Sequence, residues 1–361
     1  MIIKSIELQN FRNYDSLKME LDEKTNILYG DNAQGKTNVL EALYLSGTTK
    51  SHKGSKDREL IRFGQEEAHI RCLVEKAGMD YRIDMHLRKN KSKGIAINGI
   101  PIRKAAELFG ILNIIFFSPE DLDIIKRGPS ERRRFTDLEL CQLDKIYLHN
   151  LTNYNKVLNQ RNKLLKSLAF EPQLEDTLAI WDMQLIDYSK EIIQRRKTFM
   201  KELNEIASGV HEKLSGGRET LEVRYEPNVT EEEISIKLAE SVERDKRQKM
   251  TSVGPHRDDI CFLANGVDIR KFGSQGQQRT SALSLKLAEI ELVRRRIKDM
   301  PVLLLDDVLS ELDSNRQNYL LNTIGDLQTV ITCTGLDEFI NNRFEINKIY
   351  KIVNGSISQS N

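Results

Sequence analysis

Short apolar runs separated by tight turns dominate the first third of this chain. Residues 1 to about 117 alternate in a way that predicts strands and turns. The pair Asn98-Gly99 within Ile95–Ile102 predicts a hairpin, because Asn and Gly adopt positive φ at little cost. The uninterrupted apolar run Ile111–Phe117 predicts a buried strand that stops at Ser118-Pro119.

The middle of the chain changes to helical spacing. Apolar residues recur mostly three or four positions apart from Ser130 to about Lys166 and again from Leu178 to Val210. Pro172 lies between the two stretches, so the spacing predicts two long helices joined by a turn as an antiparallel hairpin. At ~1.5 Å per residue each helix would extend about 50 Å. Such a hairpin either projects from a globular head or folds over it as a compact helical lobe, and the pattern leaves both open.

Strand-like patterns return in the last part of the chain. A second Asn-Gly pair, Asn265-Gly266, predicts another hairpin. The other expected elements are a strand at Leu221–Tyr225, a charged helix near residues 231–249, an amphipathic helix from Thr280 to about Lys298, and apolar strands at Pro301–Asp307 and Gln328–Cys333. Strands and helices therefore alternate at both ends of the chain, around a helical middle.

Composition bounds the class of protein. With 361 residues, 39% of them hydrophobic, the chain can bury a large core, and its length predicts two parts. The net charge of +1 gives no global attraction to nucleic acid, so any such role must depend on local patches. The four cysteines form no C-x-x-C pair, which argues against a zinc site or a disulfide framework. No apolar run approaches the roughly 20 residues of a membrane span, and the start lacks the apolar core of a signal peptide, so we expect a soluble cytoplasmic protein.

A complete G-x-x-x-x-G-K-T phosphate-binding loop lies among the first strands. It follows the apolar stretch Lys24–Tyr29 and precedes the helically spaced Asn38–Leu45. This context makes the pattern a site, because loop N–H groups and the helix N-terminus then face the phosphates. Lys36 is expected between the β- and γ-phosphates, and the Thr37 hydroxyl on Mg²⁺. The expected residues for a nucleoside triphosphate are Gly30, Asp31, Asn32, Ala33, Gln34, Gly35, Lys36 and Thr37.

A second candidate half-site lies far along the chain. Val302–Asp307 is an apolar run ending in two acids, typical of a buried parallel strand that delivers carboxylates to its C-terminal end. Asp306 would bind Mg²⁺ through water, and Asp307 would orient the attacking water as general base. The expected catalytic residues are thus Asp307 and Lys36. Apolar runs ending in Asp are common, so the assignment of these two acids to a nucleotide site depends on neighbouring motifs.

Those neighbouring motifs carry a resemblance to a known family. Ser274–Gln278 resembles the L-S-G-G-Q signature of ABC-type ATPases, with Gln275 in place of the first Gly, and Ser310–Asp313 resembles their D-loop. Asn10-Phe11-Arg12 is similar to the N-F-R motif of the SMC-like repair ATPases. Stretches that resemble the RecF family specifically are Phe117–Leu122, Gly128–Phe135, Gly254–Asp259 and Gly273–Thr280.

The resemblance implies an α/β fold, an ABC-type P-loop ATPase head of mixed-sheet lobes with an inserted helical arm. Residues 1–117 would form the N-terminal half of the head, residues 118–250 the mainly helical arm, and residues 251–361 the C-terminal half of the head. The implied nucleotide contacts beyond the phosphate loop are Arg12, Ser274, Gly276 and Gln277, the last three on the nucleotide of a partner chain.

The chain departs from the wider ABC pattern at three places. The usual catalytic Glu is Asp307, which is one methylene shorter. No clear Q-loop glutamine is found, and Ser118–Asp121 occupies that region. Thr332 and Thr334 stand where ABC proteins place a switch His. These departures predict weak hydrolysis.

The resemblance implies an ATP-gated DNA clamp of recombinational repair. Two ATP molecules would be held between two protomers, and the homodimer would bind gapped DNA and act with RecR and RecO in loading RecA and inducing the SOS response. Weak, DNA-stimulated ATP hydrolysis would reset it. A transporter ATPase subunit shares the loop, signature and acids but gives no reason for the long helical insertion or the N-F-R motif. A nuclease of the ATPase-plus-Toprim type would need a C-terminal domain for which the chain has no room.

Three basic clusters are candidate DNA contacts. Few aromatics are interleaved among them, so contact with the duplex backbone is expected rather than base stacking. In a chain with 30% charged residues most such runs are solvated faces, and the sequence does not choose among the three. The clusters are Arg88–Lys93; Lys50, His52, Lys53, Lys56 and Arg58; and Arg132–Arg134.

Overall fold

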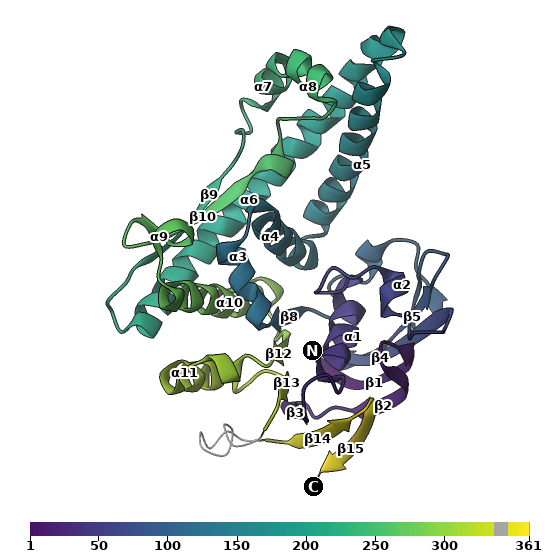
Figure 1. Ribbon diagram of the computed structural model, residues 1–361, viewed down its shortest axis with the longest axis vertical. Coiled ribbons are helices and arrows are strands. Elements are labelled where there is room, and N and C mark those ends of the chain that lie inside the picture. The colour runs from purple at the N-terminus through teal and green to yellow at the C-terminus, as the bar shows by residue number, and fades with distance from the viewer. Residues whose placement is uncertain (336–345, 361) are drawn as a thin grey trace. The chain divides into compact units, whose positions relative to one another are not determined.

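The computed structural model describes residues 1–335 and 346–360, and the chain divides into two units. Unit 1 comprises Met1–Asp121 and Glu289–Asn361, and unit 2 comprises Leu122–Ala288 (Figure 1). Residues 251–288, which the sequence assigns to the C-terminal half of the head, thus fall in unit 2. The physical reason is that β10 (Asp259–Ala264) pairs with β9 (Leu221–Glu226) along its whole length. No helix in the described part of the chain is long and apolar enough to cross a lipid bilayer.

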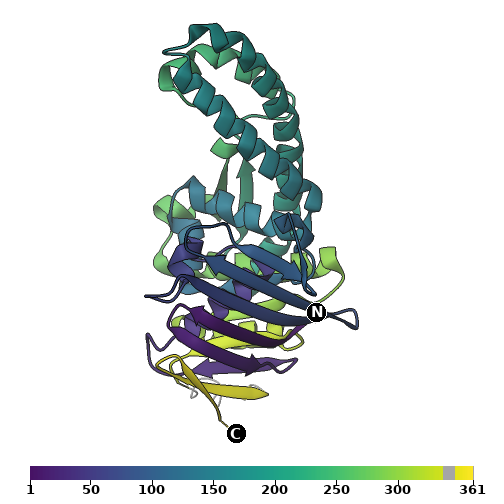
Figure 2. The same ribbon diagram turned by 90° about the vertical axis from the view of Figure 1, so that its right-hand side faces the viewer.

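Unit 1 contains an antiparallel sheet built from the N-terminal residues (Figure 2). Its strand order is β2-β1-β4-β5-β6-β7. The strands are β1 (Ile2–Phe11), β2 (Tyr14–Glu20), β4 (Glu67–Lys76), β5 (Met79–Arg88), β6 (Gly94–Ile97) and β7 (Ile100–Pro101). The predicted hairpin at Asn98-Gly99 is confirmed, with φ of 51° and 81° at its two turn residues. Buried and exposed residues alternate along β4 and β5, so one face of this sheet meets the core and the other meets solvent.

The second sheet of unit 1 is mainly parallel and has the order β15-β14-β3-β13-β12-β8. Its strands are β3 (Thr25–Tyr29), β8 (Ile114–Phe117), β12 (Val302–Asp306), β13 (Thr329–Cys333), β14 (Lys348–Val353) and β15 (Ser356–Ser360), of which β15 is antiparallel. Every residue of β12 and β13 is buried, as the predicted parallel strands require. Helix α1 (Lys36–Thr48) contacts strands of both sheets, and for this reason every residue from Val39 to Thr48 is buried. Unit 1 also contains helix α11 (Ser314–Ile324), the short α2 (Asp57–Leu60) and the C-terminal part of α10 (Gln275–Ile297).

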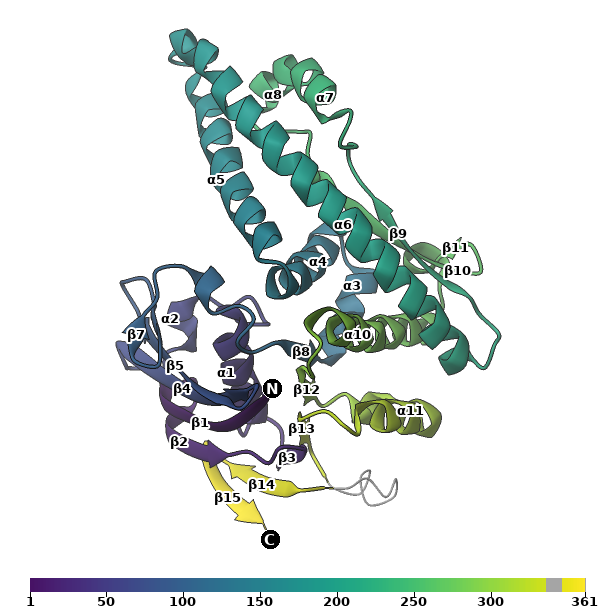
Figure 3. The same cartoon turned by 180° about the vertical axis from the view of Figure 1, so that it is seen from behind.

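Unit 2 is mainly helical (Figure 3). Its helices are α3 (Leu122–Lys126), α4 (Pro129–Leu143), α5 (Lys145–Ser167), α6 (Leu178–Ser215), α7 (Ile234–Glu240), α8 (Val242–Gln248), α9 (Ile269–Phe272) and the start of α10 (Gln275–Ile297), beside a small sheet β11-β10-β9 with β11 at Val267–Asp268. The predicted pairing of two long helices is confirmed by α5 and α6, which pack along each other.

Two of the helix predictions for unit 2 were wrong in their extent. The single helix expected over residues 130–166 is broken at Asp144, whose extended backbone ends α4 and whose carboxylate accepts hydrogen bonds from the N–H groups of Ile146 and Tyr147. This capping arrangement starts a new helix, α5. The charged helix expected near residues 231–249 is also two short helices, α7 and α8.

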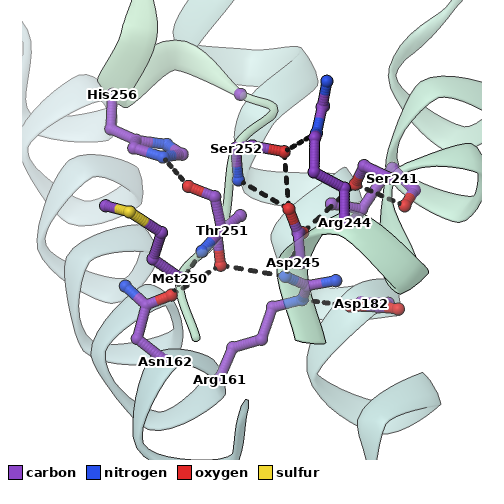
Figure 4. A network of polar contacts seen from close by, with 12 residues as sticks. Arg161, Asn162, Asp182, Ser241, Arg244, Asp245, Met250, Thr251, Ser252 and His256 are labelled. Carbon is purple, nitrogen blue, oxygen red and sulfur yellow. Dashed lines mark hydrogen bonds and ion pairs between the residues drawn. The ribbon is translucent and has the colours of Figure 1, made fainter. Parts of the chain in front are cut away.

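A buried polar network joins α5, α6, α8 and the segment before β10 (Figure 4). The Arg161 guanidinium, which is fully buried, donates to Asp182 (2.5 Å), to Asp245 (2.7 Å) and to the Thr251 hydroxyl (2.9 Å). His256, a residue of the stretch that resembles the RecF family, contacts the Tyr154 hydroxyl and the Thr251 carbonyl. Burial lowers the pKa of His256 to about 4, so this ring is neutral at physiological pH and holds the unit together through hydrogen bonds.

Arg196 is the centre of a second network in unit 2. Its guanidinium donates to Asp258 (2.8 Å), to Asp137 (2.7 Å), to the Tyr147 hydroxyl (3.0 Å) and to the Pro255 carbonyl (2.7 Å). The Arg196 and Asp258 side chains are 3% and 1% exposed. Buried charges are tolerated only when they are paired in this way, so the two networks fix how the long helices meet the β10 segment.

Candidate functional site

The phosphate loop runs from β3 to α1 and is held in a narrow space. Gly30 (φ 149°) and Gly35 (φ 112°) have positive φ. A Cβ on Gly30 would lie 2.4 Å from the Ile352 carbonyl oxygen, and one on Gly35 would lie 2.5 Å from the Asn13 side chain. Both positions therefore require glycine, because a side chain would be strained at this φ and would have no space. This explains why the motif has glycine at these two positions.

The Lys36 side chain lies back across the loop. Its Nζ donates to the carbonyl oxygens of Gly30 (2.5 Å) and Asp31 (2.9 Å), and the residue is 7% exposed. The ammonium group is thus positioned inside the concave side of the loop, at the N-terminal end of α1. A fixed cation beside a helix N-terminus is an arrangement that attracts phosphate groups.

The two predicted halves of the site meet at one carboxylate. Asp306 ends β12, and its Oδ1 accepts hydrogen bonds from the Thr37 hydroxyl (2.8 Å) and the Thr332 hydroxyl (2.7 Å). Burial raises the pKa of Asp306, and the two hydroxyl donors oppose that rise. Strand order β3-β13-β12 explains the encounter, because the carboxyl ends of these parallel strands share one edge of the sheet.

Asp307 has an unusual backbone. Its φ is 54°, in the left-handed region that costs a residue with a side chain ~1–2 kcal/mol, and its N–H donates to the Thr332 hydroxyl (3.0 Å). Thr332 therefore holds both acids, since it also donates to Asp306. Strain of this kind is concentrated at functional sites. Sequence reasoning noted Thr332 only as the residue in the place of a switch His, and no local signal indicated its double contact.

Arg12 is paired with a buried acid on α1. Its Nε and Nη2 donate to the two oxygens of Glu41 (2.7 and 2.9 Å), and Nη2 also donates to Ser55 (2.8 Å). Burial by itself would raise the pKa of Glu41, but hydrogen bonds from Arg12 and Ser51 outweigh it and hold that pKa below its usual range. The Arg12 side chain is thereby fixed beside the start of α1, and its contact with phosphates stays a prediction. Glu41 was missed, although an acid in an otherwise apolar stretch was a usable signal.

Two turns brace the phosphate loop from outside. Asn13, in the β1–β2 turn, donates to the Gln34 carbonyl (2.9 Å), and the buried Tyr14 hydroxyl donates to the Gly35 carbonyl (3.0 Å). From the β14–β15 turn, the Asn354 N–H donates to the Gln34 side chain (2.6 Å). These supports were not predicted, because they join residues more than twenty and more than three hundred positions apart.

The donor set fits a nucleoside triphosphate with Mg²⁺. The glycine loop leaves no room for a Cβ, the Lys36 ammonium lies within it, and Thr37 and Asp306 offer hydroxyl and carboxylate oxygens, which Mg²⁺ prefers. The predicted loop residues Gly30, Asp31, Asn32, Ala33, Gln34, Gly35, Lys36 and Thr37 all lie between β3 and the first turn of α1.

Comparisons with known proteins converge on one family. The RecF/RecN/SMC N-terminal domain family matches residues 2–358. The DNA replication and repair protein RecF of Agathobacter rectalis is 65% identical over 357 residues, which cover 99% of each chain. The protein of the same name from Clostridium botulinum (strain Eklund 17B) is 43% identical over 362 residues, again covering 99% of each chain. The chain belongs to the RecF family.

Solved structures agree with this RecF-family assignment. A chain described as the recombination mediator protein RecF-ATP in the RecFOR pathway is 38% identical, with a TM-score of 0.93, and the match covers 99% of this chain and 97% of that chain. A head of Smc bound to the C-winged helix domain of ScpA matches with a TM-score of 0.57 and 16% identity, covering 100% of this chain and 97% of that chain, which supports the fold alone. The predicted fold, an ABC-type P-loop ATPase head with an inserted helical arm, is confirmed.

The segment that resembles the ABC signature, Ser274–Gln278, lies in unit 2 at the start of α10. The Ser274 hydroxyl accepts from the Gln277 N–H (3.2 Å), and the Gln277 side chain accepts from the Ser274 N–H (2.9 Å). This reciprocal capping starts the helix at Gln275, five residues before the predicted Thr280. Ser274 and Gly276 are exposed, so this helix start is available to a ligand.

The three basic clusters of this RecF-family chain differ in exposure. In the third cluster, Arg132 is 1% exposed and pairs with Asp259 (2.6 Å), and Arg133 donates to the Asp258 carbonyl, so these two are structural. In the first cluster, Lys89 pairs with Glu66 and Lys93 with Asp57. The second cluster keeps four exposed cations, which are Lys50, Lys53, Lys56 and Arg58.

Proposed function

We propose that this chain is an ATP-dependent DNA-binding protein of recombinational repair that ATP assembles into a homodimer. The observation that carries the proposal is the meeting of the two half-sites, in which hydroxyls from the phosphate loop and from β13 converge on Asp306. Relatives described as RecF with ATP in the RecFOR pathway support it. RecR and RecO are the corresponding partners, and RecA loading at gapped DNA, with SOS induction, is the corresponding task.

Each chain would bind one ATP through its own loop. The loop N–H groups, the Lys36 ammonium and the start of α1 would hold the phosphates, with Arg12 beside them. Thr37 and Asp306 would hold Mg²⁺, which neutralises charge on the phosphate oxygens when bound. Asp307 would take a proton from the attacking water, and its shorter side chain supports slow turnover.

Changing Asp307 to Asn is expected to preserve ATP binding and to lower ATP turnover by ~10²–10⁴-fold, because only the proton-accepting oxygen is lost. The ATP-bound dimer should then accumulate. Phosphate release measures turnover, and sedimentation measures the dimer. Asp326→Asn is the matched control, because Asp326 is an exposed acid after α11. Wild-type turnover in Asp307→Asn would place the general base elsewhere, with Glu311 the next residue to test.

The signature segment would complete the ATP site of a partner chain. Its exposed serine and the helix start behind it form an anion-binding surface. A homodimer would therefore contain two composite sites. The DNA surface would use local cations, of which Lys50, Lys53, Lys56 and Arg58 are the most exposed set.

Changing Ser274 to Arg is expected to leave ATP binding by the monomer nearly intact and to abolish ATP-dependent dimerisation, because it places bulk and charge in the composite site. Sedimentation with and without ATP measures this, and the exposed Ser16→Arg on β2 is the control. Adding duplex or gapped DNA at two salt concentrations tests the same assembly, because phosphate contacts weaken as salt rises. Loss of ATP binding by the Ser274→Arg monomer would refute a site shared between chains. DNA binding that does not depend on ATP would refute an ATP-gated clamp, and the absence of salt-sensitive DNA binding would favour a transporter-type ATPase.

A further inference from the structure

Three metal-binding side chains share the solvent face of the antiparallel sheet in unit 1. Glu67 and His69 are two residues apart on β4, so they point to the same face. His86 on β5 lies directly opposite His69 in the strand register. Their neighbours Ala68, Ile70 and Leu87 are buried on the other face, which fixes this orientation. A hollow of about 930 Å³ runs along this face, and both histidines line it.

The three ligand atoms lie close enough to bind one ion. His86 Nε2 is 2.7 Å from Glu67 Oε2, and His69 Nε2 is 3.8 Å from Glu67 Oε1. All three ligand atoms lie within 4.8 Å of one another. Ligand atoms bound at ~2.1 Å in a tetrahedral zinc site are about 3.4 Å apart. Small side-chain rotations therefore bring this set to zinc-binding distances.

Glu67 differs from the neighbouring carboxylates in its partners. Nearby carboxylates on the same sheet are neutralised by basic side chains, since Asp84 pairs with Arg71 and Glu66 with Lys89. Glu67 contacts only the two imidazoles within the described chain. The imidazole rings are stacked, with centroids 4.2 Å apart and planes at 21°. Two imidazoles beside a carboxylate that has no basic lysine or arginine partner among the described residues are a donor set for a divalent transition metal.

We propose that Glu67, His69 and His86 form a Zn²⁺ site with one open coordination position toward the hollow. Two imidazoles and one carboxylate are the protein ligands of zinc sites that keep a fourth position for water or another ligand. Imidazole ligands suit zinc, copper, iron and nickel, whereas carboxylate, carbonyl and water oxygens suit Mg²⁺. The phosphate loop offers oxygen ligands only, so the two metal preferences are chemically distinct. In the described part of the chain, no other group of three such residues brings its ligand atoms this close.

Titration of the untagged, nucleotide-free full chain with Zn²⁺, by calorimetry and by competition with a chromophoric chelator, tests this site. We expect one Zn²⁺ per chain, with binding weakened by about 100-fold or more in His69→Gln, His86→Asn and Glu67→Gln, because each variant removes one of three ligands. His149→Asn, which removes an exposed imidazole of α5, should bind Zn²⁺ as the wild type does.

Two further readouts keep the test independent of folding defects. Co²⁺ in place of Zn²⁺ should give the visible absorption of a tetrahedral site in the wild type and lose it in the three variants. ATP binding and melting temperature should be unchanged in the variants, because none of these side chains belongs to the phosphate loop. Absence of stoichiometric Zn²⁺ binding, or equal binding by the wild type and His86→Asn, would reduce the cluster to a surface ion pair and overturn the proposal.

Discussion

Lys36→Ala is expected to weaken ATP binding by about 100-fold or more. Two charge-assisted contacts to phosphate oxygens are worth ~1.5–3 kcal/mol each, and every 1.4 kcal/mol changes affinity tenfold. The structure adds a second reason, because Lys36 Nζ also ties the carbonyl oxygens of Gly30 and Asp31 together within the loop. Calorimetric titration with MgATP measures the loss.

The matched control for this variant is Lys24→Ala. Lys24 is exposed and directly precedes β3, the strand whose other end leads into the loop, so Lys24→Ala makes the same charge change without removing a contact within the loop. Its ATP affinity should equal that of the wild type. Thermal unfolding of both variants checks that unit 1 is intact. Unchanged ATP affinity in a folded Lys36→Ala protein would remove the phosphate loop as the nucleotide site.

Arg196→Met is expected to lower the free energy of unfolding of unit 2 by about 3–5 kcal/mol, the cost of removing one partner from a buried ion pair. The change leaves two carboxylates, Asp258 and Asp137, without their shared cation. Burial already raises the pKa of Asp258, and Arg196 opposes that rise, so its loss leaves a buried charge that is poorly compensated.

A single tryptophan makes this measurement selective. Trp181 lies on α6 in unit 2 and is the only tryptophan of the chain, so urea denaturation followed by its fluorescence reports this unit. Lys197→Met is the control, because Lys197 is the next residue on the helix and its side chain is 65% exposed. A deficit in Arg196→Met no larger than that of Lys197→Met would mean that the network contributes nothing to stability.

The elements that were predicted correctly are those encoded by neighbouring residues. The phosphate loop, the Asn98-Gly99 hairpin and the apolar strand ending at Asp306 each have a local signal, a motif, a turn pair or an apolar run. The pairing of β10 with β9 was not predicted, because it joins segments that are far apart in the sequence. The local pattern of a strand does not specify which other strand it pairs with. The break at Asp144 was missed because a capping carboxylate interrupts a helical pattern without disturbing its apolar spacing.

Within the candidate site, the sequence identified the groups that meet phosphate and metal but not their supports. Thr37 and Asp306 were predicted separately, and their hydrogen bond follows from strand order, which no local pattern specifies. Thr332, Glu41 and Asn13 act by holding other residues in place. Such roles depend on three-dimensional neighbours, so polar residues of this kind look ordinary in a sequence.

The strand order of the second sheet also sets when the phosphate loop can form during synthesis. Strand β3, which leads into the loop, pairs with β13 on one side and β14 on the other. Residues Tyr29 and Lys351 face each other in that ladder, a separation of roughly 320 positions that makes closure entropically costly and slow. The loop's own strand therefore leaves the ribosome long before either of its partners exists. A chain whose synthesis stops before β13 carries the whole G-x-x-x-x-G-K-T motif and yet has no partner strand for β3.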